Sequence, residues 1–179
     1  MALPILETAT YELTLPSSNV QVKYRPFLVK EEKILLLAME SDNAGEITKA
    51  LKDIVHACTF GSINVDLLPT FDLEYIFLNV RAKSVGEVAK LKLPCPDDKE
   101  TYAQVELDLS KVNVEVDDEH SNEIVVNDKI KMVLAYPTID SFDPNQDAKT
   151  LKTQQLFDVI GNVVYEIYEG ETVHKASDY

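Results

Sequence analysis

Histidine, cysteine and carboxylate side chains are the groups in this 179-residue chain that could carry catalysis or bind a metal ion. The three histidines, His56, His120 and His174, are scattered, and none has a second ligand at the spacing of a zinc motif. His56 falls beside the apolar face of an expected helix, a position more typical of a structural histidine than of a catalytic base. The sequence therefore predicts neither a catalytic residue nor a metal site.

The cysteines, glycines and carboxylates do not identify a reactive site either. Cys58 and Cys95 have no local signature of a nucleophile, and we expect both to remain thiols in a reducing cytoplasm. None of the five glycines forms a GxGxxG or Walker-type loop, so the sequence predicts no cofactor and no small-molecule substrate. An acidic hydrolase built from dispersed carboxylates is an alternative class, but 31 acidic residues offer too many pairs to single one out.

Charge narrows the range of partners. The 31 acidic and 17 basic residues give a formal net charge of -14, which repels phosphate backbones, so we expect no nucleic-acid partner. Such a charge favours either solubility or a basic protein partner. The chain has no apolar run long enough for a membrane span, and residues 1–7 do not resemble a secretory signal. We therefore expect no membrane association and no export.

The hydrophobic pattern predicts an α+β fold that begins with a hairpin. Residues 11–15 and 20–24 alternate apolar with polar positions, as the two strands of an N-terminal β-hairpin do. The next element, residues 30–40, is predicted to be a helix. Its apolar side chains cover every side instead of one stripe, so we expect this helix to be largely enclosed.

Two further helices are predicted to complete a helical cluster. One begins after Asn43, which has capping-box spacing to Glu46, and its apolar face includes Cys58. The other begins at Thr70, with Asp72 near its positive end. The apolar stripe of this third helix consists of Leu73, Ile76, Phe77 and Val80.

A change to alternating periodicity after Gly86 predicts a β lobe. Residues 89–93 and 103–109 are expected to pair as half-buried strands. Three more short strands are expected, at residues 112–116, 124–126 and 130–134. The last two flank a tight turn at Asn127.

The chain is predicted to end with a linker and a helix. Residues 140–147 contain Pro144 and three aspartates, which is typical of a linker. The helix after it has an apolar side formed by Leu156, Val159, Ile160, Val163, Val164 and Ile167. We expect this side to dock on the chain's own core, with docking on another protein as the alternative. The predicted segments are a hairpin with three helices at 1–87, an antiparallel β lobe at 88–139, and the linker with its helix at 140–179.

Several motifs resemble one known family. The segment YRPFLVKEEKILLLAME at residues 24–40 resembles the baseplate hub subunit family of T-even-type myophages. The same order of motifs continues with FDLEYIF at residues 71–77 and VRAKSVG at residues 80–86. The sequence IKMVLAY at residues 130–136 resembles the strand that closes the β lobe of that family. The resemblance covers roughly residues 3–140.

This resemblance implies a non-enzymatic hub subunit that acts in baseplate and tail assembly in a contractile tail. A transient hub assembly chaperone, absent from the mature virion, is the alternative. The implied partners are other baseplate hub or tail proteins, and the implied locations are the virion baseplate and the host cytoplasm during assembly. Some relatives carry paired cysteines in the β turn, whereas Cys95 has no second cysteine beside it, so a zinc knuckle is not expected here.

A candidate protein interface lies where the hairpin meets the helices, at Tyr24, Arg25, Pro26 and Phe27. Our hypothesis is that Arg25 docks on a carboxylate while Phe27 plugs the hairpin onto the helices. The alternative is a local turn in which Arg25 lays its alkyl chain along the surface and keeps its charge in water.

Overall fold

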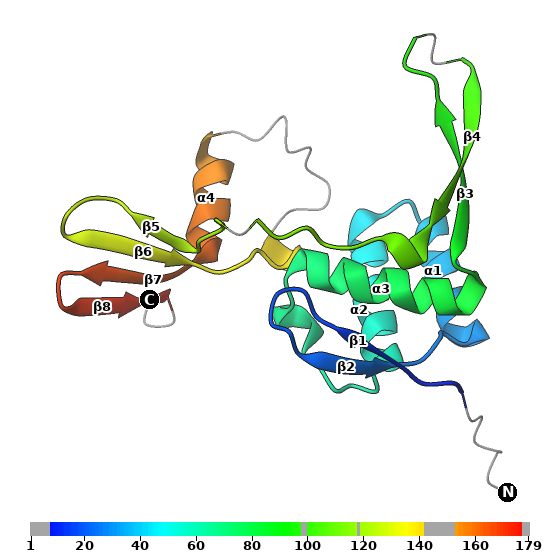
Figure 1. The fold of residues 1–179 in the computed structure, drawn as a ribbon, viewed down its shortest axis with the longest axis horizontal. Coiled ribbons are helices and arrows are strands. Elements are labelled where there is room, and N and C mark those ends of the chain that lie inside the picture. Colours follow the sequence, from blue (N-terminus) through cyan, green and yellow to red (C-terminus); the bar gives the residue numbers. More distant parts are fainter. Residues whose placement is uncertain (1–7, 98–99, 118, 142–152, 177–179) are drawn as a thin grey trace, which may run out of the picture. The chain divides into compact units, whose positions relative to one another are not determined.

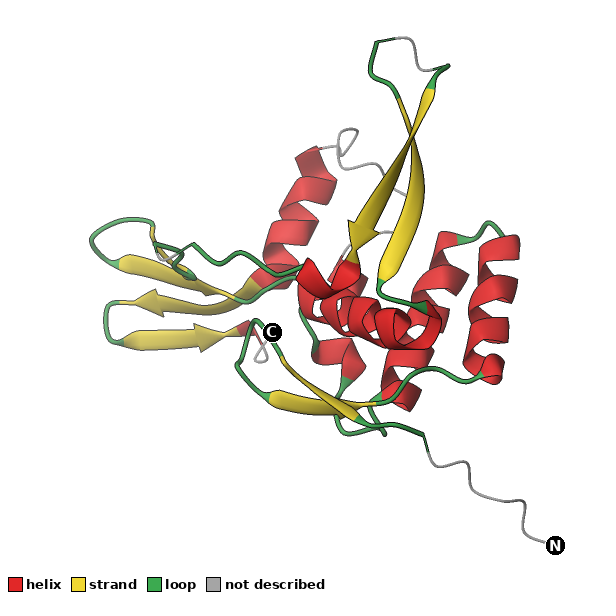
Figure 2. Ribbon diagram, turned by 45° about the vertical axis from the view of Figure 1, so that its right-hand side comes forward, coloured by secondary structure: helices red, strands yellow, loops and turns green. Residues whose placement is uncertain are grey.

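The computed structural model describes residues 8–97, 100–117, 119–141 and 153–176. These residues form helices and small antiparallel sheets, so the fold class is α+β, as the sequence predicts (Figure 2). Contacts group the chain into two compact units. The first contains Met1–Val65 and Phe71–Val114, and the second contains Asp66–Thr70 and Glu115–Tyr179. The division into three segments stays a prediction about independent folding.

The first unit begins with the predicted hairpin. Strands β1 (Tyr11–Thr14) and β2 (Gln21–Tyr24) pair antiparallel, with Leu13 opposite Val22. Both of these side chains are buried, as expected for the inward positions of alternating strands. The turn between the strands is tied to a helix, because the backbone N–H and the hydroxyl of Ser17 both donate to the carboxylate of Asp72. The hairpin is therefore anchored at its turn.

Helices α2 (Ala44–Cys58) and α3 (Thr70–Val85) confirm two predictions from the sequence. Asn43 caps α2, since its side-chain oxygen accepts hydrogen bonds from the backbone N–H groups of Gly45 at 2.9 Å and Glu46 at 3.3 Å. A 3₁₀ turn, η1 (Val65–Leu67), precedes α3. The apolar faces of the two helices supply the most deeply buried apolar side chains of the unit, Ile54, Val55, Cys58, Leu73, Ile76 and Val80.

Helix α1 (Val29–Glu40) forms where a helix is predicted, but the expectation that it is largely enclosed is wrong. Only Glu31 and Ala38 are buried, and these two residues are seven apart and share one side of the helix. The helix packs against α2. An apolar sequence on every side therefore does not mean that the described residues of this chain enclose α1.

A long two-stranded ribbon extends from the helices of the first unit (Figure 1). Strand β3 (Val88–Pro94) pairs antiparallel with β4 (Tyr102–Asp108), as predicted. The expectation that both strands are half-buried is wrong, because only Ala89 is buried and it packs in a small cluster at the base with Ala82 and Leu109.

The residues after β4 do not form the strand predicted at 112–116. Instead, Asp108 caps a short 3₁₀ turn, η2 (Leu109–Lys111), by accepting a hydrogen bond from the Ser110 N–H at 3.1 Å. Residues 112–116 form no strand. Alternation alone cannot form a strand without a neighbour to receive its backbone hydrogen bonds.

The second unit contains a four-stranded antiparallel sheet in the order β5-β6-β7-β8. Strands β5 (Glu123–Val125) and β6 (Ile130–Leu134) form the predicted hairpin. In its turn, the Asn127 side chain accepts hydrogen bonds from the N–H groups of Lys129 and Ile130. The strands predicted at residues 88–139 belong to two sheets, because β5 and β6 share no sheet with β3 and β4.

The C-terminal part differs from the single helix predicted there. Helix α4 (Thr153–Val163) ends before Val164, and strands β7 (Val164–Glu169) and β8 (Thr172–Lys175) follow it. Strand β7 pairs with β6, so Val164 and Ile167 lie in the sheet. Gly170, between β7 and β8, has the positive φ of a tight turn. A short 3₁₀ turn, η3 (Ile139–Ser141), overlaps the start of the linker predicted at residues 140–147. The rest of that linker, residues 142–147, lies outside the described residues.

Candidate protein-binding surfaces

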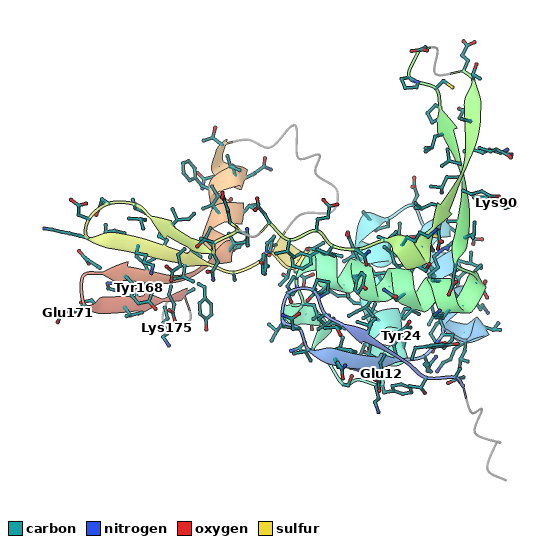
Figure 3. All side chains as sticks on the ribbon, in the orientation of Figure 1. Glu12, Tyr24, Lys90, Tyr168, Glu171 and Lys175 are labelled. Carbon is teal, nitrogen blue, oxygen red and sulfur yellow. The ribbon has the colours of Figure 1, made fainter. Side chains whose placement is uncertain are left out.

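The segment predicted as an interface forms the junction between the hairpin and the helices of the first unit. Tyr24 is buried and its ring lies 5.7 Å from that of Tyr11 (Figure 3). Burial raises the pKa of the Tyr24 hydroxyl, and the nearby Lys83 ammonium offsets part of this effect. The backbone N–H of Phe27 donates to the Ser84 hydroxyl at 2.9 Å, which joins the end of the hairpin to α3. These contacts are all internal to the chain.

Arg25 docks on a carboxylate, which is the first part of the sequence hypothesis. Its Nη2 lies 3.0 Å from Oε1 of Glu31, and the two side chains are only 11 % and 3 % exposed. The same guanidinium donates to the Pro26 carbonyl at 2.9 Å through Nη1, and the Arg25 backbone N–H donates to the Cys58 carbonyl at 2.9 Å. Arg25 thus connects the hairpin to both α1 and α2.

Glu31 is the carboxylate at the centre of this junction. Its second oxygen, Oε2, accepts a hydrogen bond from the Leu28 backbone N–H at 2.7 Å, so the side chain also caps the start of α1. Burial by itself would raise the pKa of Glu31, but hydrogen bonds from Arg25 and Leu28 outweigh it and hold the pKa below its ordinary value. The carboxylate is therefore ionised and committed to the fold.

The residues that could carry chemistry do not converge. Among the described residues, no group of three histidine, cysteine or acidic side chains has a geometry that could hold a metal ion. Cys58 is fully buried, and burial raises the pKa of its thiol to about 11, which suppresses the reactive thiolate. His56 is exposed on α2, and the ring of His120 stacks on that of Tyr136. Within the part of the chain that the structure describes, no helix is long and apolar enough to cross a membrane.

Helix α1 presents an exposed apolar surface that the sequence pattern did not identify. Four of its apolar side chains are 44–59 % exposed, namely Ile34, Leu36, Leu37 and Met39, and we call them the α1 surface. Residues three apart are neighbours on a helix, so Ile34 lies beside Leu37 and Leu36 lies beside Met39. The signal was present in the sequence as a helix that is apolar on every side. Such a helix is enclosed either by its own chain or by a partner.

The ribbon presents a second exposed apolar surface in the first unit. Cross-strand pairing places Leu91 opposite Val105 and Ala89 opposite Leu107, and opposite residues in an antiparallel pair share one face. Four side chains on this face are 39–49 % exposed, namely Leu91, Leu93, Val105 and Leu107, and we call them the ribbon surface. The other face is polar, with Lys90 and Glu106 forming an ion pair of 3.4 Å (Figure 3).

The α1 surface and the ribbon surface indicate the class of protein to which the chain belongs. A two-stranded ribbon is only marginally stable in water unless its apolar face is covered, and clustered apolar side chains on a folded scaffold mark contacts with other proteins. The described residues with reactive groups are buried, paired or scattered. The first unit therefore has the properties of a structural protein that works by binding other proteins.

Comparison with known families assigns the chain to one family. The chain matches the family described as T4 bacteriophage base plate protein over residues 8–179 and belongs to it. It is thus a structural protein related to the baseplate of T4-type phages, and the family places it in the virion tail. No curated protein and no solved structure matches the chain.

Proposed function

We propose that this chain is a non-enzymatic subunit of the baseplate hub that acts in baseplate and tail assembly. The observation that carries the proposal is the exposure of the α1 surface and the ribbon surface in a member of a baseplate family. Clustered apolar side chains of this kind are stabilised by burial against another protein, at roughly 25 cal/mol for each Å² removed from water. The partners are other proteins of the hub or tail.

The proposed interface at Tyr24, Arg25, Pro26 and Phe27 has a supporting role in this account. Arg25 and Glu31 fix the start of α1 relative to the hairpin, so they set the position of the α1 surface. The formal net charge of -14 supports protein partners over nucleic acid. During assembly the chain is in the host cytoplasm, and afterwards it is in the baseplate.

Quantitative mass spectrometry of purified tails beside assembly intermediates tests the subunit role. We expect peptides of this chain in both samples, at a constant ratio to other baseplate proteins. Presence in intermediates together with absence from finished tails would contradict a subunit and support a transient hub assembly chaperone. A chaperone would use the same apolar surfaces and leave when a later protein covers its binding site.

A further inference from the structure

The second unit buries almost none of its apolar side chains. Among its described residues only Leu68 is buried, and no described residue of the sheet or of α4 is. A helix and a sheet are stable in water when they share a buried apolar core. This unit therefore has apolar surface that its own described residues do not cover.

The largest exposed apolar side chains on its helix lie together. Leu156, Phe157 and Ile160 on α4 are 49 %, 63 % and 42 % exposed, and we call them the α4 surface. Ile160 is four positions after Leu156 and three after Phe157, so all three side chains share one face of the helix. Leu156 and Ile160 belong to the apolar side that we expect to dock on the chain's own core, and the described residues leave both about half exposed.

On one face of the sheet, in contrast, charged side chains pair with one another. Strand register places Glu123, Glu166 and Lys175 in one row across the sheet, with Lys131 and Tyr168 in the neighbouring row of the same face. Lys131 pairs with Glu123, and Lys175 lies 3.7 Å from Glu166. The Tyr168 hydroxyl donates to Glu166 at 2.7 Å (Figure 3). The charged side chains named on this face are therefore paired within the sheet.

Charge decides what can cover the α4 surface. Most of the net negative charge of the chain lies in the second unit, and Lys131 and Lys175, two of its few basic side chains, are already paired with carboxylates. Two copies of such a unit would bring like charges together, which opposes self-association. A segment that carries lysine or arginine would instead be attracted to it.

We propose that the α4 surface is a docking site for a segment of another protein in which apolar side chains are flanked by lysine or arginine. The apolar side chains cover Leu156, Phe157 and Ile160, and the basic side chains are attracted by the net negative charge of the second unit. The proposal goes beyond the hub role. It rests on that role only in one respect, namely that the natural partner is another protein of the tail.

A peptide titration of the full chain tests the proposal. The probe is a synthetic amphipathic peptide of leucine and lysine, and its control is the same peptide with glutamate in place of lysine. We compare the wild type with Phe157→Gln/Ile160→Gln and with the control Val20→Gln/Val85→Gln, which changes two exposed apolar residues outside the named surfaces. If circular dichroism shows a changed fold in the double α4 variant, Phe157→Gln alone replaces it.

We expect the α4 variant to bind the lysine peptide at least about tenfold more weakly than the wild type, and the control variant to bind as the wild type does. Added salt should weaken binding, and the glutamate peptide should not bind. Equal binding by the α4 variant, or by the glutamate peptide, would overturn the proposal. So would sedimentation showing a wild-type dimer that Phe157→Gln dissociates, because the occupant would then be a second copy. Absence of the chain from finished tails would contradict the subunit role and leave the peptide result intact.

Discussion

Replacement of Arg25 by alanine gives the sharpest test of how the hairpin is held to the helices. The mutation removes the guanidinium that lies 3.0 Å from Glu31, while both side chains are almost fully buried. Removal of one partner of a buried ion pair costs about 3–5 kcal/mol. Lys30 Nζ lies 3.3 Å from the same oxygen of Glu31 and keeps part of the compensation, so we expect a loss near the lower end of that range. Since small domains have a free energy of unfolding of about 5–15 kcal/mol, this loss should be visible in any melting experiment.

A double-mutant cycle assigns the loss to the pair. Urea unfolding followed by circular dichroism would compare the wild type, Arg25→Ala, Glu31→Gln and the double variant. We expect each single variant to lose about 3 kcal/mol and the double variant to lose clearly less than their sum, because the buried charge disappears with its partner. Losses below about 1 kcal/mol would show that the pair behaves as an exposed one, and would refute the reasoning. Loss of partner binding at unchanged stability would instead identify Arg25 as part of an interface.

Four further predictions follow from individual side chains. The pKa of Glu31 is lower in the folded state than its ordinary value of 4.5, so its contribution is complete above that pH and is lost as the pH falls through the folded pKa. The acid-induced decrease in unfolding free energy should therefore be smaller in Glu31→Gln than in the wild type. Cys58 is buried and its thiol has a pKa of about 11, so at pH 8 it should react with Ellman's reagent far more slowly than Cys95. The variant Cys95→Ser reports the rate of Cys58, and Cys58→Ser reports the rate of Cys95. Equal rates in the two variants would contradict this prediction. Asp72→Ala leaves the Ser17 donors without their acceptor and should cost about 1–3 kcal/mol in urea unfolding, whereas Glu74→Ala on the same helix, at an exposed position, should cost less than about 0.5 kcal/mol. Asn43→Ala removes the α2 cap and should cost about 1 kcal/mol, and Asn43→Asp, which keeps the acceptor oxygen, should restore most of it.

Local patterns in the sequence predicted the elements whose partners are close in the chain. The alternation around the first hairpin, the cap at Asn43 and the apolar spacing of α2 and α3 each specify both an element and the side that it buries. The prediction that the last helix continues through Val164 and Ile167 was wrong, because apolar positions three apart fit a helix as well as a strand end. The β-branched and aromatic side chains of Val164–Glu169, followed by Gly170, favoured the β-hairpin that forms.

Burial was the property that the sequence could not specify. Periodicity identifies the apolar side of an element, but it does not identify the surface that covers it, which can belong to another protein. For α1 and for the ribbon the described residues of this chain supply no such cover, so the expected burial was wrong at Leu36, Leu91 and Val105. The choice of Arg25 as a residue that docks on a carboxylate was correct, and the identity of Glu31 as that carboxylate needed the structure.

Incorporation of an α1 variant into the phage tests most directly the claim that the exposed apolar surfaces bind other tail proteins. Phage lacking the natural chain would be supplied with Leu36→Gln/Leu37→Gln or with the control Lys33→Gln, which changes an exposed polar residue of the same helix. Hub intermediates would then be analysed by quantitative mass spectrometry. We predict that the double variant melts like the wild type but is depleted at least about tenfold from the intermediates, while the control is retained. Wild-type amounts of a folded double variant in the intermediates would contradict the account.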